Sequence, residues 1–188
     1  MNIAYTAPLL HAAANAGRDA IQAKQNPWTI SSNDFFSSVE TVRDLFAGIV
    51  DGNSDCVAIT PAVSYGIALA AKNLPLEEGQ SVVVLHDQFP SNIYSWRNLA
   101  SQKNAVVKTI PRPVDSDWTA ALLDGIDDNT AIVAVSNCHW TDGTLIDLEK
   151  IGERCRAKGC ALVVDGIQSL GAMPFSIERG QPDFLVTA

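Results

Sequence analysis

Four short segments of the sequence join apolar runs to residues whose chemistry suits a ligand site. In the first, Thr60–Gly66, small residues stand where an apolar run gives way to a helical pattern. The first N–H groups of a helix carry partial positive charge and bind phosphate, and the Ser64 hydroxyl adds a donor. The same hydroxyl also suits a simple helix cap. The two commonest nucleotide-binding patterns, GxGxxG and GxxxxGKS/T, are absent from the sequence.

An acidic residue, Asp165, ends the apolar run Ala161–Asp165 and is followed by Gly166. Burying a carboxylate is costly unless the group meets a cation or hydrogen-bond donors. A metal ion or a protonated ring nitrogen would meet that need. An aspartate that caps a turn at the solvent edge fits the residues equally well, so the sequence leaves both interpretations open.

Two further segments follow apolar runs and carry an amide or aromatic side chain. After the run 130–136 the sequence reads Asn137-Cys138-His139. Neighbouring residues of an extended chain point to opposite sides, so Cys138 and His139 are a poor nucleophilic pair, and Asn137 is the better candidate for a site. Phe89, after the run 81–86, offers either a flat face for an aromatic ligand or a core side chain.

Alternating apolar and amphipathic segments predict the elements that position these residues. Helical spacing predicts a helix that Asn33 or Asp34 caps and that stops at Gly52, with further helices at about 63–73, 90–102, 116–126 and 147–158. Short runs rich in Val and Ile predict buried strands at 56–60, 81–86, 105–110, 130–136, 161–165 and 183–187. This alternation is typical of an α/β domain with a largely parallel sheet, in which ligands bind at the carboxyl ends of the strands.

Composition and charge exclude several classes of function. Of the 188 residues, 47% are hydrophobic and 18% charged, which excludes intrinsic disorder and allows one sizeable core. A net charge of −8 disfavours nucleic acid as a partner, and no uncharged run is long and apolar enough to span a membrane. Four cysteines without a CxxC pair fit reduced thiols in the cytoplasm, and the widely spaced histidines predict no metal site.

Two stretches carry the most specific pattern, TPAVSYGIALAAKNLP and VVDGIQSLGAMPFSIERGQPDFLV. Together with the segments 34–50, 82–96 and 133–148, they resemble the class V aminotransferase group of fold-type-I, pyridoxal-phosphate-dependent enzymes. That group also contains cysteine desulfurases, selenocysteine lyases, kynureninases and isopenicillin N epimerases. The resemblance implies an α/β fold, a three-layer α/β/α large domain with a mostly parallel sheet, at residues 34–188 and incomplete at its C-terminus. Residues 1–33 would form an N-terminal segment.

The resemblance also implies a role for each candidate residue. The backbone around Ala62 and Val63, with the Ser64 hydroxyl, would hold the phosphate of pyridoxal 5′-phosphate. The contacts to its ring would come from Phe89, which stacks on the ring, from Asn137 and Gln168 near the phenolic oxygen, and from Asp165, which pairs with the pyridine nitrogen and keeps it protonated.

Two positions depart from the pattern of the group. Desulfurases and lyases usually have His where this chain has Phe89, and Phe stacks but cannot transfer protons. The lysine that forms the Schiff base with the cofactor is expected just beyond Ala188, and none of the six lysines present takes its position. The resemblance therefore implies a fragment that holds no catalytic residue, lacks the C-terminal small domain and is inactive by itself.

The implied function is a pyridoxal-phosphate-dependent transformation of a small-molecule amino acid, of aminotransferase or lyase type. The alternative from another class is a non-catalytic α/β domain that binds a phosphorylated ligand or a partner chain. Because proteins of the group are usually homodimers, we expect a homodimer. The cysteines, the net charge and the hydropathy described above add the expectation of a cytoplasmic protein with no nucleic-acid or membrane partner.

Overall fold

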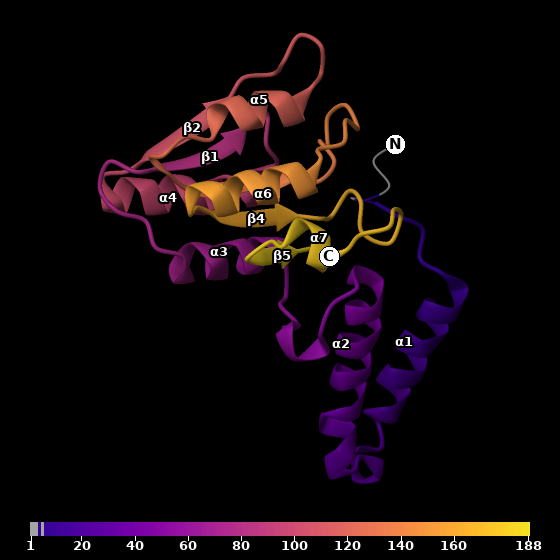
Figure 1. The fold of residues 1–188 in the computed structure, drawn as a ribbon. Helices are drawn as coiled ribbons and strands as arrows, with labels where there is room; N and C mark the ends of the chain where they lie inside the picture. Colours follow the sequence, from indigo (N-terminus) through magenta and orange to yellow (C-terminus); the bar gives the residue numbers. More distant parts are fainter. Residues whose placement is uncertain (1–3, 5) are drawn as a thin grey trace. The chain divides into compact units, whose positions relative to one another are not determined.

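The computed structural model describes residue 4 and residues 6–188, and Figure 1 shows their helices and strands. These residues form two compact units. One comprises the described residues up to 48 together with 53–59, and the other comprises 49–52 together with 60–188. The boundary expected between an N-terminal segment at 1–33 and a large domain at 34–188 stays a prediction. Residues 1–3 and 5 of that segment lie outside the described residues.

The first unit is helical. Its elements are α1 (His11–Ala23), the 3-10 turns η1 (Pro27–Thr29) and η2 (Ser32–Phe35), most of α2 (Ser37–Val50), and the 3-10 turn η3 (Ser54–Cys56). The predicted helix therefore starts later than expected. Ser31 and Asp34 form a capping box on η2, so the predicted cap at Asn33 or Asp34 of the long helix is wrong. At its other end α2 stops at Val50, because Asp51 takes a left-handed conformation with φ of 55°.

The predicted strand at Cys56–Thr60 is also wrong. Cys56 ends η3, and residues 57–60 pair with none of the strands in the described part of the chain. Arg43 Nε donates to the carbonyl oxygen of Val57 at 2.9 Å, and Arg43 Nη2 donates to that of Ser54 at 2.7 Å. A run of β-branched residues favours extended backbone, but a strand also requires a neighbour with free backbone groups.

A parallel sheet forms the core of the second unit, as the alternating pattern predicted. Its strands lie in the order β2-β1-β3-β4-β5, and each neighbouring pair is parallel. All the carboxyl ends therefore meet at one edge of the sheet. The bounds are β1 (Ser81–Leu85), β2 (Val106–Ile110), β3 (Thr130–Ser136), β4 (Ala161–Asp165) and β5 (Phe184–Val186).

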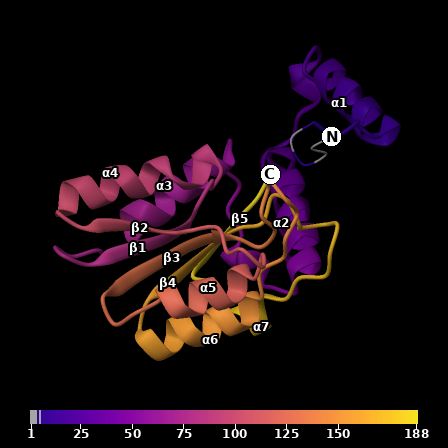
Figure 2. The same cartoon turned by 90° about the horizontal axis from the view of Figure 1, so that it is seen from above.

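Helices cover both faces of this sheet, which confirms the three-layer α/β/α arrangement (Figures 1 and 2). α3 (Val63–Asn73) and α4 (Tyr94–Lys103), the latter preceded by the turn η4 (Pro90–Asn92), pack on one face around Ile67 and Trp96. α5 (Trp118–Gly125) and α6 (Leu148–Lys158) pack on the other face around Leu122 and Ile151. The short helix α7 (Ile177–Gly180) lies against α6 and leads to β5. Within the described chain, no helix combines the length and apolar character that a membrane crossing requires.

Candidate functional site

The N-terminal turn of α3 lies at the carboxyl edge of the sheet. A Cβ added to Gly66 would lie 2.5 Å from Cγ1 of Val186, the last residue of β5, so a glycine is required for this approach. The carbonyl oxygen of Ala62 accepts from the N–H groups of Tyr65 and Gly66. The N–H groups of Val63 and Ser64 precede the first intrahelical hydrogen bonds, and such groups suit an anion.

The side chain of Ser64 is available to a ligand. It is exposed and forms no hydrogen bond with a described residue, so it does not act as a helix cap. Ala62, which precedes the helix with φ of −165° and ψ of 160°, has no side chain that could cap it. The turn therefore presents free N–H groups and a hydroxyl at one place, the set of donors that a phosphate accepts from.

Asp165 ends β4 and is only 3% exposed. The N–H of Ile167 donates to its Oδ1 at 3.1 Å, and no other described residue donates to this carboxylate. Burial raises the pKa of Asp165, and the hydrogen bond from Ile167 opposes that rise without cancelling it. Asp165 thus bonds the turn that follows it, yet it is buried rather than at the solvent edge. A cation placed beside it would stabilise its charged form.

β5 brings the turn of α3 and Asp165 to the same place. Val186 pairs with Asp165 in register and also contacts Gly66. Asp165 lies two residues after Val163, which faces α3 and α4, so the alternation of the strand directs the carboxylate to the same face. Ser136, the register partner of Asp165 on β3, adds a buried hydroxyl that has no hydrogen-bond partner among the described residues.

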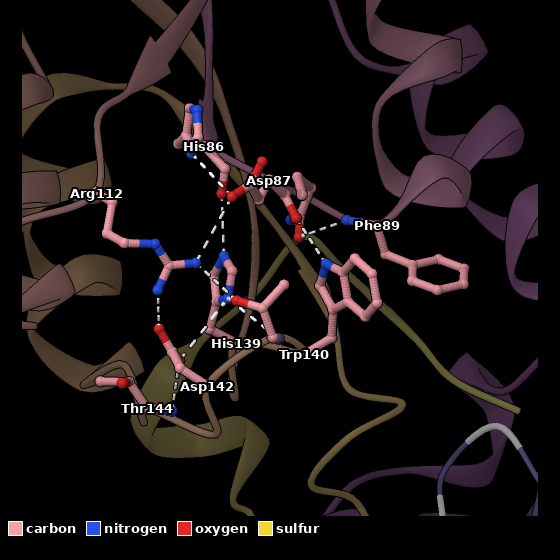
Figure 3. Close-up of polar contacts among 10 residues, drawn as sticks. His86, Asp87, Phe89, Arg112, His139, Trp140, Asp142 and Thr144 are labelled. Carbon is pink, nitrogen blue, oxygen red and sulfur yellow. Dashed lines mark hydrogen bonds and ion pairs between the residues drawn. The ribbon is translucent and has the colours of Figure 1, made fainter. Parts of the chain in front are cut away.

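Phe89 follows β1 at this edge, and Figure 3 shows the polar contacts around it. The ring of Phe89 is half-buried and meets the ring of Trp140 edge to face, with centroids 5.3 Å apart and planes at 88°. Trp140 Nε1 also donates to the carbonyl oxygen of Asp87 at 2.6 Å. Phe89 is therefore neither a fully buried core residue nor a loose surface ring, and part of its surface remains open to a ligand.

His139, which the sequence suggested only as a poor partner for Cys138, is fully buried. Its ring stacks on Trp118 at 4.9 Å and 8°, and its Nε2 lies 3.0 Å from the carbonyl oxygen of His86. A carbonyl oxygen only accepts, so Nε2 carries the hydrogen. Nδ1 then faces the hydroxyl of Thr141 at 2.9 Å. No local sequence signal marks a histidine buried in this way, because its partners come from distant segments.

The surroundings of Cys138 do not favour a nucleophilic thiolate. Burial and the neighbouring charge of Asp142 raise the pKa of its thiol. A thiol is nucleophilic as the thiolate, so a raised pKa disfavours the reactive form of Cys138.

The backbone N–H of Asn137 donates to the carbonyl oxygen of Asp165 at 3.3 Å, but the Asn137 side chain is directed elsewhere. The Asn137 amide donates to the carbonyl oxygen of Ile146 at 3.2 Å, and Asn137 lines a cavity of about 180 Å³ with Met173 and Phe175, beside α6 and α7. Gln168 is half-buried in the turn after β4. Their contacts with a ring oxygen stay predictions, and the Asn137 amide has a second N–H besides the one that bonds Ile146.

The fold and this edge define an α/β domain that offers a helix N-terminus with open N–H groups, an aromatic face and a buried carboxylate. The family model described as aminotransferase class V matches residues 11–188, and the chain belongs to that family. The described residues hold no group of three or more side chains suited to a metal ion.

Individual relatives are distant and longer. The chain is 27% identical over 169 residues to an uncharacterized aminotransferase, YcbU, of Bacillus subtilis, covering 89% of this chain and 43% of that protein. It is 32% identical over 124 residues to a probable cysteine desulfurase of Mycobacterium leprae, covering 64% of this chain and 20% of the other. The chain thus spans less than half the length of these relatives.

Solved structures share the fold. A C-DES mutant with glycine covalently linked to its PLP cofactor superposes with a TM-score of 0.89 at 20% identity, covering 100% of this chain and 51% of that one. The cystine C–S lyase C-DES with its product cysteine persulfide also gives 0.89 at 20% identity, covering 100% and 52%. At such identities the likeness concerns the fold alone.

Proposed function

We propose that residues 34–188 form the pyridoxal-phosphate-binding large domain of an enzyme that transforms an amino acid. The observation that carries this proposal is Asp165, a buried carboxylate with one hydrogen-bond donor among the described residues. It shares a face and an edge of the sheet with the open N-terminal turn of α3. A ligand with a cationic ring nitrogen and a phosphate matches both features. Pyridoxal phosphate, the cofactor of the class V family, has both groups.

Each residue of the edge would hold a different part of the cofactor. The N–H groups of Val63 and Ser64, with the Ser64 hydroxyl, would bind the phosphate, and Phe89 would cover one face of the ring. Asp165 would hold the proton on the ring nitrogen. When bound, the protonated ring supplies an electron sink for bonds that break at the α-carbon of the substrate.

The burial of Asp165 makes that pairing strong. Water competes little at a carboxylate that is 3% exposed, so a hydrogen bond between opposite charges gains more there than at the surface. Without a cation the same burial disfavours the charged carboxylate and raises its pKa. Asp165 is thus suited to a cationic partner and poorly suited to being charged alone.

The class of reaction belongs to the same proposal. Relatives carry the descriptions aminotransferase and cysteine desulfurase, so both transamination and lyase chemistry on an amino acid fall within it. Phe89 restricts the mechanism, because a phenyl ring cannot take or give a proton. Proton transfer at the substrate must come from a group other than the residue that stacks on the ring.

Homodimerisation and a cytoplasmic location also belong to the proposal. Large apolar side chains of the first unit are exposed, among them Trp28 at 78%, Phe35 at 70% and Phe36 at 69%, and apolar surface of this kind marks association. The four cysteines are free thiols, which fits a reducing compartment. Sedimentation equilibrium of the purified chain tests the dimer, and a monomer at all concentrations would contradict it.

Titration of the 188-residue chain with pyridoxal phosphate tests the cofactor site. We expect weak, saturable, non-covalent binding that inorganic phosphate competes away, measured by equilibrium dialysis and by the change in cofactor absorbance. Asp165→Asn should weaken this binding. Asp124→Asn, the same change at an exposed position of α5, should leave it intact. The proposal fails if the chain takes up no pyridoxal phosphate at millimolar concentrations.

A further inference from the structure

Two consecutive residues after β3 hold two consecutive carbonyl groups after β1. His139 Nε2 donates to the carbonyl oxygen of His86 at 3.0 Å, and Trp140 Nε1 donates to that of Asp87 at 2.6 Å (Figure 3). Asp87 has φ of 54°, a left-handed conformation that aspartate adopts at some cost. The two hydrogen bonds therefore fix the backbone turn from which Phe89 projects.

Trp140 contacts the side chain of Phe89 as well as the backbone of Asp87, two residues before it. The two rings meet edge to face at 5.3 Å, within the range in which aromatic pairs attract each other. Phe89 also has a backbone restraint of its own, because its N–H donates to Gln88 Oε1 at 3.2 Å. Trp140 thus restrains the ring and Gln88 restrains the backbone, and the exposed part of the half-buried Phe89 is left for a ligand.

Trp140 is itself held by the segment around it. The His139 N–H donates to the carbonyl oxygen of Thr144 and the Gly143 N–H to that of His139, both at 2.8 Å, which closes a tight turn. Arg112 forms an ion pair with Asp142 in this turn and donates to the Thr141 hydroxyl at 2.6 Å. The buried stack of His139 on Trp118 anchors the base of the turn in the core.

We propose that Trp140 is a positioning residue that presets the ring of Phe89 for stacking on the aromatic ring of a ligand at the Asp165 edge. The inference rests on the proposed function for the identity of that ligand, pyridoxal phosphate. Its physical basis is preorganisation. A ring that is already oriented loses less conformational freedom on binding than a free one, so binding is tighter with no further contact.

The first experiment needs no cofactor. Isotope-labelled phenylalanine rings are observed by NMR in the wild-type chain, and Phe89→Leu identifies the Phe89 signals by their loss. Trp140→Leu should change the chemical shifts of the Phe89 ring and move them toward the values of a freely rotating phenyl ring. Trp140→Phe keeps an aromatic partner, so the Phe89 shifts should stay near their wild-type values. Trp28→Leu, a matched change at an exposed tryptophan, should leave them unchanged. Circular dichroism and thermal melting check that each variant is folded.

The second experiment measures the affinity for pyridoxal phosphate in a double-mutant cycle. Trp140→Leu should raise the Kd by about three- to tenfold, and Trp140→Phe should restore most of the affinity. In a Phe89→Leu background, Trp140→Leu should have no further effect, because Trp140 acts through Phe89.

Two results would overturn the inference. One is a set of Phe89 signals that Trp140→Leu leaves unchanged. The other is an equal loss of affinity from Trp140→Leu whether or not Phe89 is present, which would mean that Trp140 contacts the ligand or supports the fold in general. If the wild-type chain binds no pyridoxal phosphate, the proposed function fails, and the Phe89 signals still decide whether Trp140 holds the ring.

Discussion

Gly66 in the first turn of α3 faces Val186 at the end of β5 so closely that a Cβ on residue 66 would lie 2.5 Å from Val186 Cγ1. Val186 is also the register partner of Asp165. One apolar contact, with no chemistry of its own, therefore sets the distance between the N-terminal turn of α3 and the buried carboxylate. A change at Gly66 should affect both the stability of the chain and its site.

Gly66→Ala should push α3 away from β5. We expect a loss of about 1–3 kcal/mol in the free energy of unfolding, typical of overpacking a core, together with weaker binding of pyridoxal phosphate. Urea denaturation measures the first and equilibrium dialysis the second. Gly17→Ala is the matched control, because its Cβ would meet nothing within 4 Å and alanine favours a helix. Equal stability of both variants would contradict the close approach.

Asp165→Asn should make the chain more stable at neutral pH while it weakens cofactor binding. The pKa of Asp165 is raised by burial, so the stability that its neutral form contributes is complete below the unfolded pKa of about 3.9 and is lost as the pH rises through the folded pKa. Asparagine stays neutral and still accepts from the Ile167 N–H. The expected gain at pH 7 is about 1–3 kcal/mol, the scale on which a poorly satisfied buried group costs stability.

Urea unfolding between pH 4 and 8 checks this prediction for Asp165. The wild-type stability should fall more steeply with rising pH than that of the Asp165→Asn variant. Parallel curves would show that the carboxylate is well satisfied without a ligand, and the role assigned to Asp165 would lose its physical basis.

Ser64→Ala should separate binding from stability. The hydroxyl is exposed and has no hydrogen-bond partner among the described residues, so its loss should change the free energy of unfolding by less than about 0.5 kcal/mol. Loss of one donor to a charged phosphate should raise the Kd for pyridoxal phosphate about tenfold. Ser101→Ala, an exposed serine of α4, provides the control. An unchanged Kd would remove Ser64 from the phosphate site.

Three of the four cysteines should fall into two classes that differ in their rate of reaction with a thiol reagent. Cys56 is exposed and should react at once, whereas Cys155 and Cys160 are buried and should react only when the chain opens. The neighbouring thiol of Cys160 and burial raise the pKa of Cys155, which slows its reaction further. Timed labelling with mass spectrometry distinguishes them. Rapid labelling of Cys155 in the folded chain would contradict the packing of α6.

The sheet could be predicted because its pattern is local. β1 is buried along its whole length, and residues 82–85 read as a continuous apolar run; the interiors of β3 and β4 read in the same way. The segment Cys56–Thr60 has the same composition but no strand beside it in the described chain. Pairing depends on which other segments are near, and composition does not contain that information.

In the candidate site, too, local sequence predicts some features, whereas others depend on segments that are distant in the chain. An acid that ends an apolar run predicts the position of Asp165, but it leaves burial and a turn cap at the solvent edge equally open, and the structure shows burial. Small residues at a helix start predict the turn at Ser64. The orientation of Asn137 toward Ile146 depends on how the chain turns after β3. The stack of His139 on Trp118 and the contact between Trp140 and Phe89 join segments far apart in sequence, and no spacing within one segment reveals them.

The all-parallel sheet also has a consequence for how the chain reaches its native state. Each pair of strands that follow one another is joined through a helix, so no tight hairpin can start the sheet. β1 gains its second neighbour, β3, only after β2 and α5 have been made. Long loops must close before their contacts form, which slows folding. During synthesis the apolar edge at Val82–Val84 therefore stays unpaired until β3 has been made, and exposed apolar strands of this kind favour aggregation.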